Sequence, residues 1–237
     1  MGKKMKGIIY YTDNRLGEPM FSIVQKQILK VGLPIVSVSL KPIDFGQNIV
    51  LDLQPGVITM FRQILTALEA SASDVIFFCE HDVLYHPSHF DFEPPRDDVF
   101  YYNVNIWRWM FPEDFAVTYG GTLSLSGLCV NRQLAVNHYN LRLKIIEEKR
   151  FDNGRNPRWA RIMGYEPGKE KRRGGVSDDI CETRRSQYPI VDIRHKGAIT
   201  KTMRGLNDFR RPPNPESWKE TTLDKIEGWN LKEMFKL

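Results

Sequence analysis

Two acidic side chains that directly follow an apolar run are the first residues whose spacing could do chemistry. Val75 to Cys79 leads into Glu80-His81-Asp82. Residues i and i+2 of an extended chain point to the same side, so Glu80 and Asp82 could address one site. Carboxylates that leave a buried strand are costly unless something positive meets them. A hard divalent cation that also binds phosphate oxygens suits this geometry, and the alternative is a loop whose aspartate caps the next element.

A second pair of neighbouring acids, Asp178 and Asp179, follows two glycines. Ser177 stands before them, and the pattern predicts a short helix from about residue 178. Serine and aspartate are common N-cap residues, so capping alone explains the same letters.

Histidines stand at two further places of interest. His195 follows the apolar run Ile190–Ile193, and the basic residues beside it fit a solvated or phosphate-facing histidine. His81, His86 and His89 have no cysteine partner and lie in a proline-containing loop, so a zinc site is not favoured there.

Aromatic residues flank an arginine in Trp107-Arg108-Trp109, directly after a predicted strand. Two exposed indoles around a guanidinium would suit a sugar face or a stacked base, and Trp107 and Trp109 are therefore candidate acceptor-binding residues. Two tryptophans of the hydrophobic core would produce the same sequence pattern.

Strands and helices must position these residues, and the hydrophobic pattern alternates between the two. It predicts strands at 7–11, 34–40, 75–79, 99–104, 123–130 and 190–193, and helices over 21–31, 61–68 and 131–149. This alternation predicts an α/β fold with a mostly parallel central sheet flanked by helices. Ligands of such sheets bind outside the carboxyl ends of the strands, where Glu80 and Asp82 are expected.

Composition narrows the class of protein. The chain has 237 residues, of which 41% are apolar and 27% charged, so a disordered chain is excluded. The sequence contains no run of about 18 apolar residues, so it predicts no membrane-spanning helix. Three widely spaced cysteines and a short apolar N-terminus favour a reduced, cytoplasmic protein. We expect one domain over 1–205 and an irregular C-terminal extension over 206–237.

Charge is unevenly distributed, although the net charge is only +5. Residues 74–127 hold nine acids and two bases, which suggests a cation site. Residues 142–211 hold nineteen bases and ten acids, which suggests a phosphate-bearing partner or an ordinary solvated surface. Arg172 and Arg173 lie in this stretch and are candidate acceptor contacts.

These features, in this order, resemble the GT-A-fold glycosyltransferases. Glu80-His81-Asp82 after a buried strand looks like their D-x-D motif, with glutamate in place of the first aspartate. Asp178-Asp179 is similar to their acidic motif at the start of a late helix. His195 fits the histidine that many members place after the last strand of the sheet. The resemblance spans about residues 7 to 200 and implies a GT-A-like, Rossmann-like fold.

The resemblance also implies roles for the residues. Asp82, His195 and Glu80 would hold Mn²⁺ or Mg²⁺, and a histidine ligand favours Mn²⁺. Asp179, or Asp178, would be the base that deprotonates the acceptor in an inverting transfer. The nucleotide would lie over the first strand's end and near the acidic motif. Its candidate contacts are Tyr11, Thr12, Asp13, Arg15, Glu80, His81 and Asp82.

The expected activity is therefore metal-dependent transfer of a sugar from a nucleotide-diphosphate sugar, with a UDP-sugar such as UDP-glucose favoured. The acceptor hydroxyl belongs to a hydroxymethylated DNA base, which would have to be extruded from the duplex, or to a saccharide. A non-catalytic nucleic-acid-binding protein that uses residues 142–211 is the alternative. A nucleotidyltransferase, with the same sheet and metal carboxylates, is a third possibility.

Overall fold

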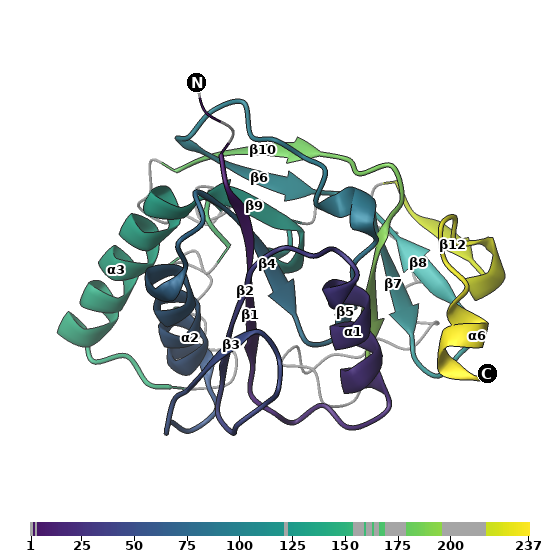
Figure 1. Cartoon of the computed structure of the whole chain (residues 1–237), viewed down its shortest axis with the longest axis horizontal. Coiled ribbons are helices and arrows are strands. Elements are labelled where there is room, and N and C mark those ends of the chain that lie inside the picture. Colours follow the sequence, from purple (N-terminus) through teal and green to yellow (C-terminus); the bar gives the residue numbers. More distant parts are fainter. Residues whose placement is uncertain are drawn as a thin grey trace.

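The computed structural model describes residues 2, 4–120, 123–153, 159, 163, 166–168, 179–195 and 217–237. In these residues the strands form two sheets (Figure 1). The main sheet has seven strands in the order β10-β6-β9-β4-β1-β2-β3, and the second has five in the order β12-β8-β7-β11-β5. The mixed α/β class with a mostly parallel central sheet is confirmed.

The main sheet is parallel except at one strand. β1 (Lys6–Thr12) pairs in parallel with β2 (Ile35–Ser39) on one side and β4 (Val75–Glu80) on the other. The edge strands are parallel to their neighbours too, while the inserted β9 runs against both β4 and β6. The remaining strands of this sheet are β3 (Gln47–Val50), β6 (Val99–Asn103), β9 (Leu128–Asn131) and β10 (Ile180–Arg184).

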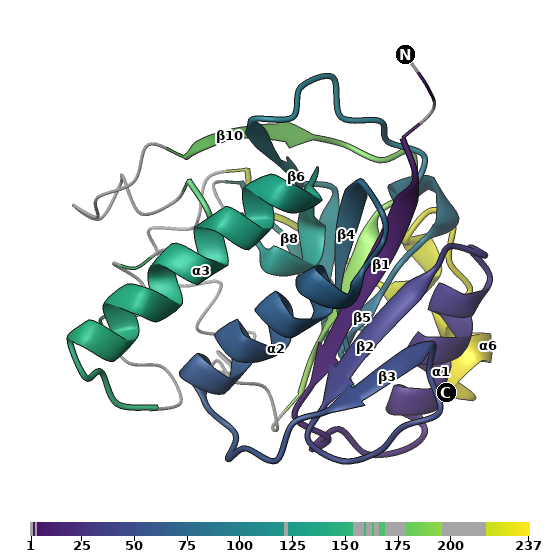
Figure 2. The ribbon, with the colours of Figure 1, turned by 60° about the vertical axis from the view of Figure 1, so that its left-hand side comes forward.

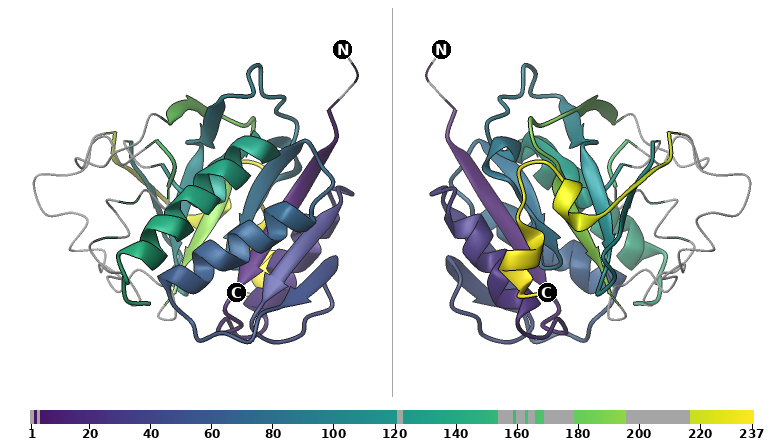
Figure 3. Two further views of the ribbon diagram at one scale, coloured as in Figure 1. Left: turned by 90° about the vertical axis from the view of Figure 1, so that its left-hand side faces the viewer. Right: turned by 90° about the vertical axis from the view of Figure 1, so that its right-hand side faces the viewer.

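Two long helices cover one face of the main sheet, α2 (Val57–Ala70) and α3 (Arg132–Glu148). Figures 2 and 3 show both on the same side. Helix α2 begins at Gly56, where the Asn153 side-chain oxygen accepts hydrogen bonds from Ile58 N–H and Thr59 N–H (2.9 and 3.3 Å). A residue 95 positions away in the sequence thus caps α2 and supplies partners for amides that a helix start leaves unsatisfied.

The second sheet and α1 (Met20–Leu29) lie on the other face, together with the C-terminal residues. Its strands are β5 (Val83–Leu84), β7 (Ile106–Met110), β8 (Ala116–Thr118), β11 (Ile190–Arg194) and β12 (Lys219–Thr221). We did not predict this sheet, because strands of two to five residues show too little alternation to be recognised. A separate hydrophobic core fills the space on each face of the main sheet.

The C-terminal residues complete the second sheet. Strand β12 pairs with β8, and α6 (Leu231–Phe235) places the Phe235 ring edge-on against Trp109, 4.7 Å between centroids. Residues 217–237 therefore hold a strand and a helix packed on the rest of the chain, where an irregular extension ending in a short helix was expected. None of the helices in the described residues has the length and apolarity to cross a membrane.

Two predicted elements are wrong in detail. The predicted helix from residue 178 is contradicted, because Ile180–Arg184 is β10 and pairs in parallel with β6. Its exposed residues gave no apolar alternation to distinguish an edge strand from a helix. The predicted strand over 123–130 is shorter, since Leu125–Gly127 forms a 3₁₀ turn before β9 begins at Leu128.

Candidate metal and ligand site

The carboxyl edge of the main sheet meets the second sheet at one tight turn. Strand β4 ends at Glu80, residues 81 and 82 turn, and β5 then joins the second sheet. The Ile193 N–H in β11 donates to the Asp82 carbonyl at 2.8 Å, so the turn is attached to β11. This attachment brings the residue that follows β11, His195, to the turn.

His81, Asp82 and His195 form a compact group, which we call the cation cluster. Their ligand atoms all lie within 4.8 Å of one another, and all three residues are half-buried. His195 Nε2 lies 3.4 Å from Asp82 Oδ2, although the two residues are 113 positions apart. The prediction that the fold brings Asp82 and His195 together is confirmed.

Charges in and around the cation cluster favour an ionised Asp82. Burial raises the pKa of this carboxyl, but contact with His195 and the nearby charges of His81 and Arg194 outweigh burial and lower the pKa below its usual value. Two imidazoles and one carboxylate are a donor set that suits Mn²⁺, Zn²⁺ or Fe²⁺ better than Mg²⁺. The residues present therefore fit a divalent metal ion, with manganese favoured over magnesium among the two predicted.

Glu80 does not belong to the cation cluster, although it was predicted as a metal ligand. The turn at residues 81 and 82 ends the extended chain, so the alternation that would align Glu80 with Asp82 is lost, and His81 joins instead. The Glu80 carboxylate accepts a hydrogen bond from the Tyr11 hydroxyl at 2.9 Å. Burial, and then repulsion from Asp82, raise the pKa of Glu80 to about 8.

A buried ion pair stands directly beside the cluster on β11. Arg194 Nη2 lies 2.7 Å from Asp192 Oδ2. Burial raises the pKa of Asp192, and the Arg194 charge opposes that rise. Arg108 on β7 is in register with Asp192 and is only 2% exposed. Sequence reasoning missed Asp192 and Arg194, whose only signal was alternation of charge within an otherwise apolar strand.

The loop after β1 lies at the same edge, but it is more closed than predicted. Tyr11 is 5% exposed and is bonded to Glu80, so its ring is not available to stack on a base. Thr12 is buried, and its hydroxyl accepts from the Asn14 N–H at 3.0 Å. Asp13 and Arg15 form an ion pair with each other.

Two residues that sequence reasoning passed over hold this loop. Asn14 has a left-handed backbone conformation (φ 59°), which asparagine tolerates better than most residues. Its side-chain oxygen accepts from Leu40 N–H and Lys41 N–H (2.8 and 2.9 Å), which ties the ends of β1 and β2 together. The Gln63 side-chain amide donates to the Thr12 carbonyl at 2.8 Å. These hydrogen bonds hold the loop at the carboxyl edge of the main sheet and give it a structural role.

Asp179 lies at the opposite edge of the main sheet. The pairings place Phe77 of β4 level with Glu182 of β10, three strands away, so Asp179 lies toward the amino ends of the strands while Asp82 lies beyond their carboxyl ends. Strand spacing and rise put more than about 20 Å between them. In Figure 1, β10 lies near the end where β1 begins. The structure does not bring Asp179 to the cation cluster.

Asp179 is instead part of a group that we call the sealed triad, with His138 and Arg142 of α3. Asp179 Oδ2 is 2.7 Å from His138 Nδ1 and accepts from Arg142 Nη2 at 3.1 Å. The His138 side chain is fully buried and that of Arg142 is 6% exposed. This arrangement holds β10 to α3, so a role for Asp179 as base at Asp82 is at odds with the geometry.

The residues predicted to bind the acceptor have different environments in the structure. Trp109 is fully buried between Phe111 and Phe235, and its indole N–H donates to the Glu113 carbonyl at 2.8 Å. As a core residue it cannot present its face to an acceptor. Trp107 is half-buried against the same core. Asp178, Arg172 and Arg173 lie outside the described residues.

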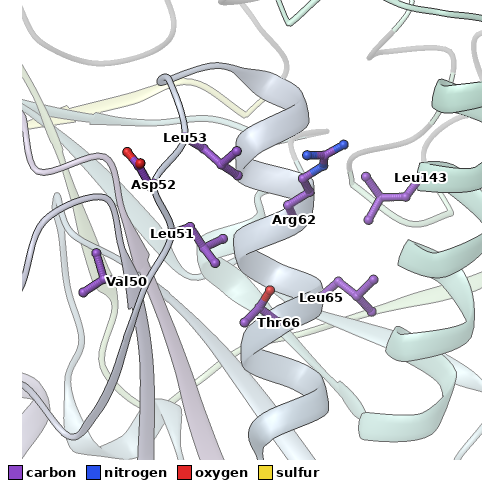
Figure 4. A pocket seen from close by; sticks show the side chains of 8 residues that line it. All are labelled: Val50, Leu51, Asp52, Leu53, Arg62, Leu65, Thr66 and Leu143. Atoms are coloured by element: carbon purple, nitrogen blue, oxygen red, sulfur yellow. The ribbon is translucent and has the colours of Figure 1, made fainter.

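A hollow on the other side of the main sheet contains none of the predicted site residues. It is lined by residues of the segment after β3, of α2 and of α3, among them Leu51, Leu53, Arg62 and Leu143 (Figure 4). Its walls are mainly leucine side chains with two charged groups at the rim. It therefore offers no second cation site.

Comparisons with known proteins give structural likeness only. No protein-family model and no curated protein sequence matches the chain. Among solved structures, the chain is similar to a glycosyltransferase involved in the glycosylation of the major capsid of PBCV-1, with 8% identity, 76% of this chain and 82% of that chain covered, and a TM-score of 0.46. It is also similar to the apo form of the glycosyltransferase GlyE of Streptococcus pneumoniae, with 11% identity, 64% and 41% covered, and a TM-score of 0.36. At these TM-scores we base function on the geometry of the site.

Proposed function

We propose that the protein is a metal-dependent glycosyltransferase that uses a nucleotide-diphosphate sugar, preferably a UDP-sugar. The observation that carries the proposal is the cation cluster. Asp82 and His195 come from distant parts of the sequence and meet at the carboxyl edge of a mostly parallel sheet, where ligands of α/β proteins bind. The resemblance of the Glu80-His81-Asp82 segment to the D-x-D motif supports the same activity.

The residues of the site have separable tasks in this proposal. His81, Asp82 and His195 would hold the metal ion, preferably Mn²⁺. A metal ion in this position would neutralise charge on the departing diphosphate. Glu80 and Tyr11 hold each other behind the cluster and fix the end of β4 against β1. Asp13 and Arg15 lie on the loop that would face the nucleoside.

The acceptor remains the less constrained half of the reaction. We propose a hydroxyl of a hydroxymethylated DNA base or of a saccharide, because nineteen bases in residues 142–211 suit a phosphate-bearing partner. An inverting transfer needs a base near the acceptor. Asp179 is bound in the sealed triad, so we do not assign that base.

The test is release of nucleoside diphosphate from a panel of UDP-, GDP- and TDP-sugars. We expect release from one donor with Mn²⁺, its loss with a chelator, and its loss in Asp82→Asn. Asp44→Asn, a change at an exposed aspartate away from the cluster, serves as the matched control. Zn²⁺ and Fe²⁺ belong in the metal series, because they share the preference for imidazole ligands. A folded protein that binds and cleaves no donor with any of these metals would contradict the proposal.

The alternative, a non-catalytic nucleic-acid-binding protein, is tested with the same variants. Arg142 of the basic stretch is buried in the sealed triad, and Arg184 turns its guanidinium over the Phe92 ring at 4.5 Å. These two bases are therefore not available to track phosphates. DNA affinity that is equal in wild type and Asp82→Asn, together with no donor cleavage, would favour the alternative.

A further inference from the structure

Two arginines and one aspartate beside the cation cluster are unequally paired. Arg194 Nη2 lies 2.7 Å from Asp192 Oδ2, so the Asp192 carboxylate is engaged by Arg194. Arg108 lies next to Asp192 in the register of the two parallel strands. Its Nε and Nη1 atoms are buried and have no hydrogen-bond partner among the described residues. The Asp192 carboxylate is thus bonded to Arg194, while Arg108 lies beside it in register and interacts with it only through charge.

A buried guanidinium with unsatisfied donors is an expensive feature. Arg108 is 2% exposed, and the contact that holds it in place is the Tyr119 ring, whose centroid lies 4.1 Å from the guanidinium carbon. Stacking on a ring face leaves the N–H edge of an arginine without partners. Burial also lowers the pKa of Arg108, which reflects the cost of the charge. An arginine used only for stability would be expected to have its donors paired.

Arg194 is the arginine that a ligand can reach. Its side chain is 28% exposed, while that of Asp192 is 12% exposed. The charges of Asp192, Asp82 and Glu80 all act on Arg194, so this arginine is attracted both by its partner Asp192 and by an acid of the cation cluster. A cation in the cluster would offset the attraction of Asp82 for Arg194. An anion bound to that cation would attract Arg194 instead.

We propose that Arg194 binds an oxyanion group of the ligand. When Arg194 leaves Asp192 to bind that ligand, Arg108 forms the ion pair with Asp192 in its place. The exchange leaves no carboxylate unpaired at any stage, and it supplies the partner that Arg108 lacks in the free protein. The ligand group is a phosphate or a carboxylate, since both match the fork of a guanidinium. The inference rests on the proposed function in one respect, the part of the substrate that carries this oxyanion. It is the diphosphate of the sugar donor or the carboxylate of an acidic sugar.

The test is calorimetric binding of inorganic pyrophosphate and of glucuronate, each with Mn²⁺ present, to wild type and variants. Arg194→Met should weaken binding about tenfold to a hundredfold, because it removes a charge-assisted hydrogen bond. Arg108→Met should weaken binding as well, although Arg194 is intact, while the melting temperature of the free protein does not fall. Arg62→Met, at an exposed arginine on α2, should bind as wild type does.

A double-mutant cycle separates the exchange from a simple charge effect. In an Asp192→Asn background there is no carboxylate to take over, so adding Arg108→Met should no longer weaken binding. Weakening with pyrophosphate alone identifies the diphosphate as the source, and weakening with glucuronate alone identifies an acidic sugar. Arg108→Lys is the second variant, which keeps the charge and should bind more weakly than wild type.

Three results would overturn the inference. The first is wild-type affinity for both probes in Arg194→Met, and the second is wild-type affinity in Arg108→Met. The third is failure of both Arg108 variants to fold, which would make Arg108 a structural cation. Donor cleavage with unchanged affinity in Arg194→Met would reject this inference alone. Binding that depends on Arg194 without cleavage of any nucleotide sugar would reject the proposed function alone.

Discussion

Among the described residues, the sealed triad and the cation cluster lie at opposite edges of one sheet, each around an aspartate, and they differ in how that aspartate is paired. In the sealed triad, one carboxylate accepts from both His138 and Arg142, whose side chains are almost fully buried. In the cation cluster, two imidazoles face the half-buried Asp82, with further acids and arginines nearby. Aspartate and histidine side chains thus form a structural joint at one edge and, in our proposal, a metal site at the other.

The comparison teaches that pairing, more than residue type, distinguishes structure from function. A carboxylate bonded to two buried side chains, here an imidazole and a guanidinium, holds together the elements that carry it and has little capacity left for a ligand. The cation cluster brings its ligand atoms within 4.8 Å at a turn between two sheets, where an ion can satisfy them together. The predictions below are ordered from the largest expected effect to the smallest.

The largest effect is expected for Asp82→Asn. Loss of the carboxylate should lower metal-dependent donor cleavage by about a thousandfold, because the metal loses its anionic ligand. The melting temperature of the metal-free protein should fall slightly, because the lowered pKa of Asp82 means that its charged form stabilises the fold near neutral pH. Titration of Mn²⁺ in the cleavage assay measures the loss of activity, and thermal unfolding in chelator measures the melting temperature. A variant that is much less stable without metal would remove the contrast with the sealed triad.

The next effect concerns stability at the other edge. Arg142→Met should lower the free energy of unfolding by about 3 kcal/mol, because it leaves a largely buried carboxylate with a weaker set of partners. Mn²⁺ affinity should be unchanged. Urea unfolding measures the first and metal titration the second. Asp179→Asn should behave in the same way, and a selective loss of turnover in that variant, with normal stability, would restore Asp179 as the base.

His89, a histidine outside both groups, sharpens the comparison through pH. Burial holds the pKa of His89 well below its usual value, so the folded protein keeps this imidazole neutral while the unfolded chain takes up a proton. Its contribution to stability is therefore full above about pH 6.5 and is lost as pH falls below that value, by up to about 1.4 kcal/mol per pH unit. Unfolding in chelator from pH 7 to 5 measures the slope. His89→Phe should flatten it, and an unchanged slope would assign the effect elsewhere.

The smallest effect is expected at the exposed pair Asp13–Arg15, which lies at the same edge as the cation cluster. Arg15→Gln should change the free energy of unfolding by less than about 0.5 kcal/mol, because exposed ion pairs contribute little. The KM for the nucleotide sugar should rise while kcat stays the same, if this loop faces the nucleoside. A change in kcat with constant KM would contradict that placement.

Much of this arrangement could be predicted from sequence, and the failures have physical reasons. Long apolar runs and wide helical stripes predicted most strands of the main sheet and α1, α2 and α3, because burial on two faces imposes a strong pattern. The two edge strands β3 and β10 are largely exposed and were missed. The approach of Asp82 and His195 was implied by the resemblance to the GT-A-fold glycosyltransferases. The role of His81 was not, since it depends on a turn that two residues make between sheets. The prediction that Trp109 binds the acceptor was wrong for a related reason, because the Phe235 side chain that covers it is distant in sequence.

The cation cluster is assembled from two parts of the chain that are made at different times. Asp82 belongs to a largely contiguous region, whereas His195 follows a strand of the second sheet, which is completed by β12 and the packing of Phe235. Domains fold as they emerge during synthesis, amino-terminal parts first. The early segment can therefore form its sheet without a complete set of metal ligands. Binding of the proposed metal ion would therefore have to wait until the second sheet is complete.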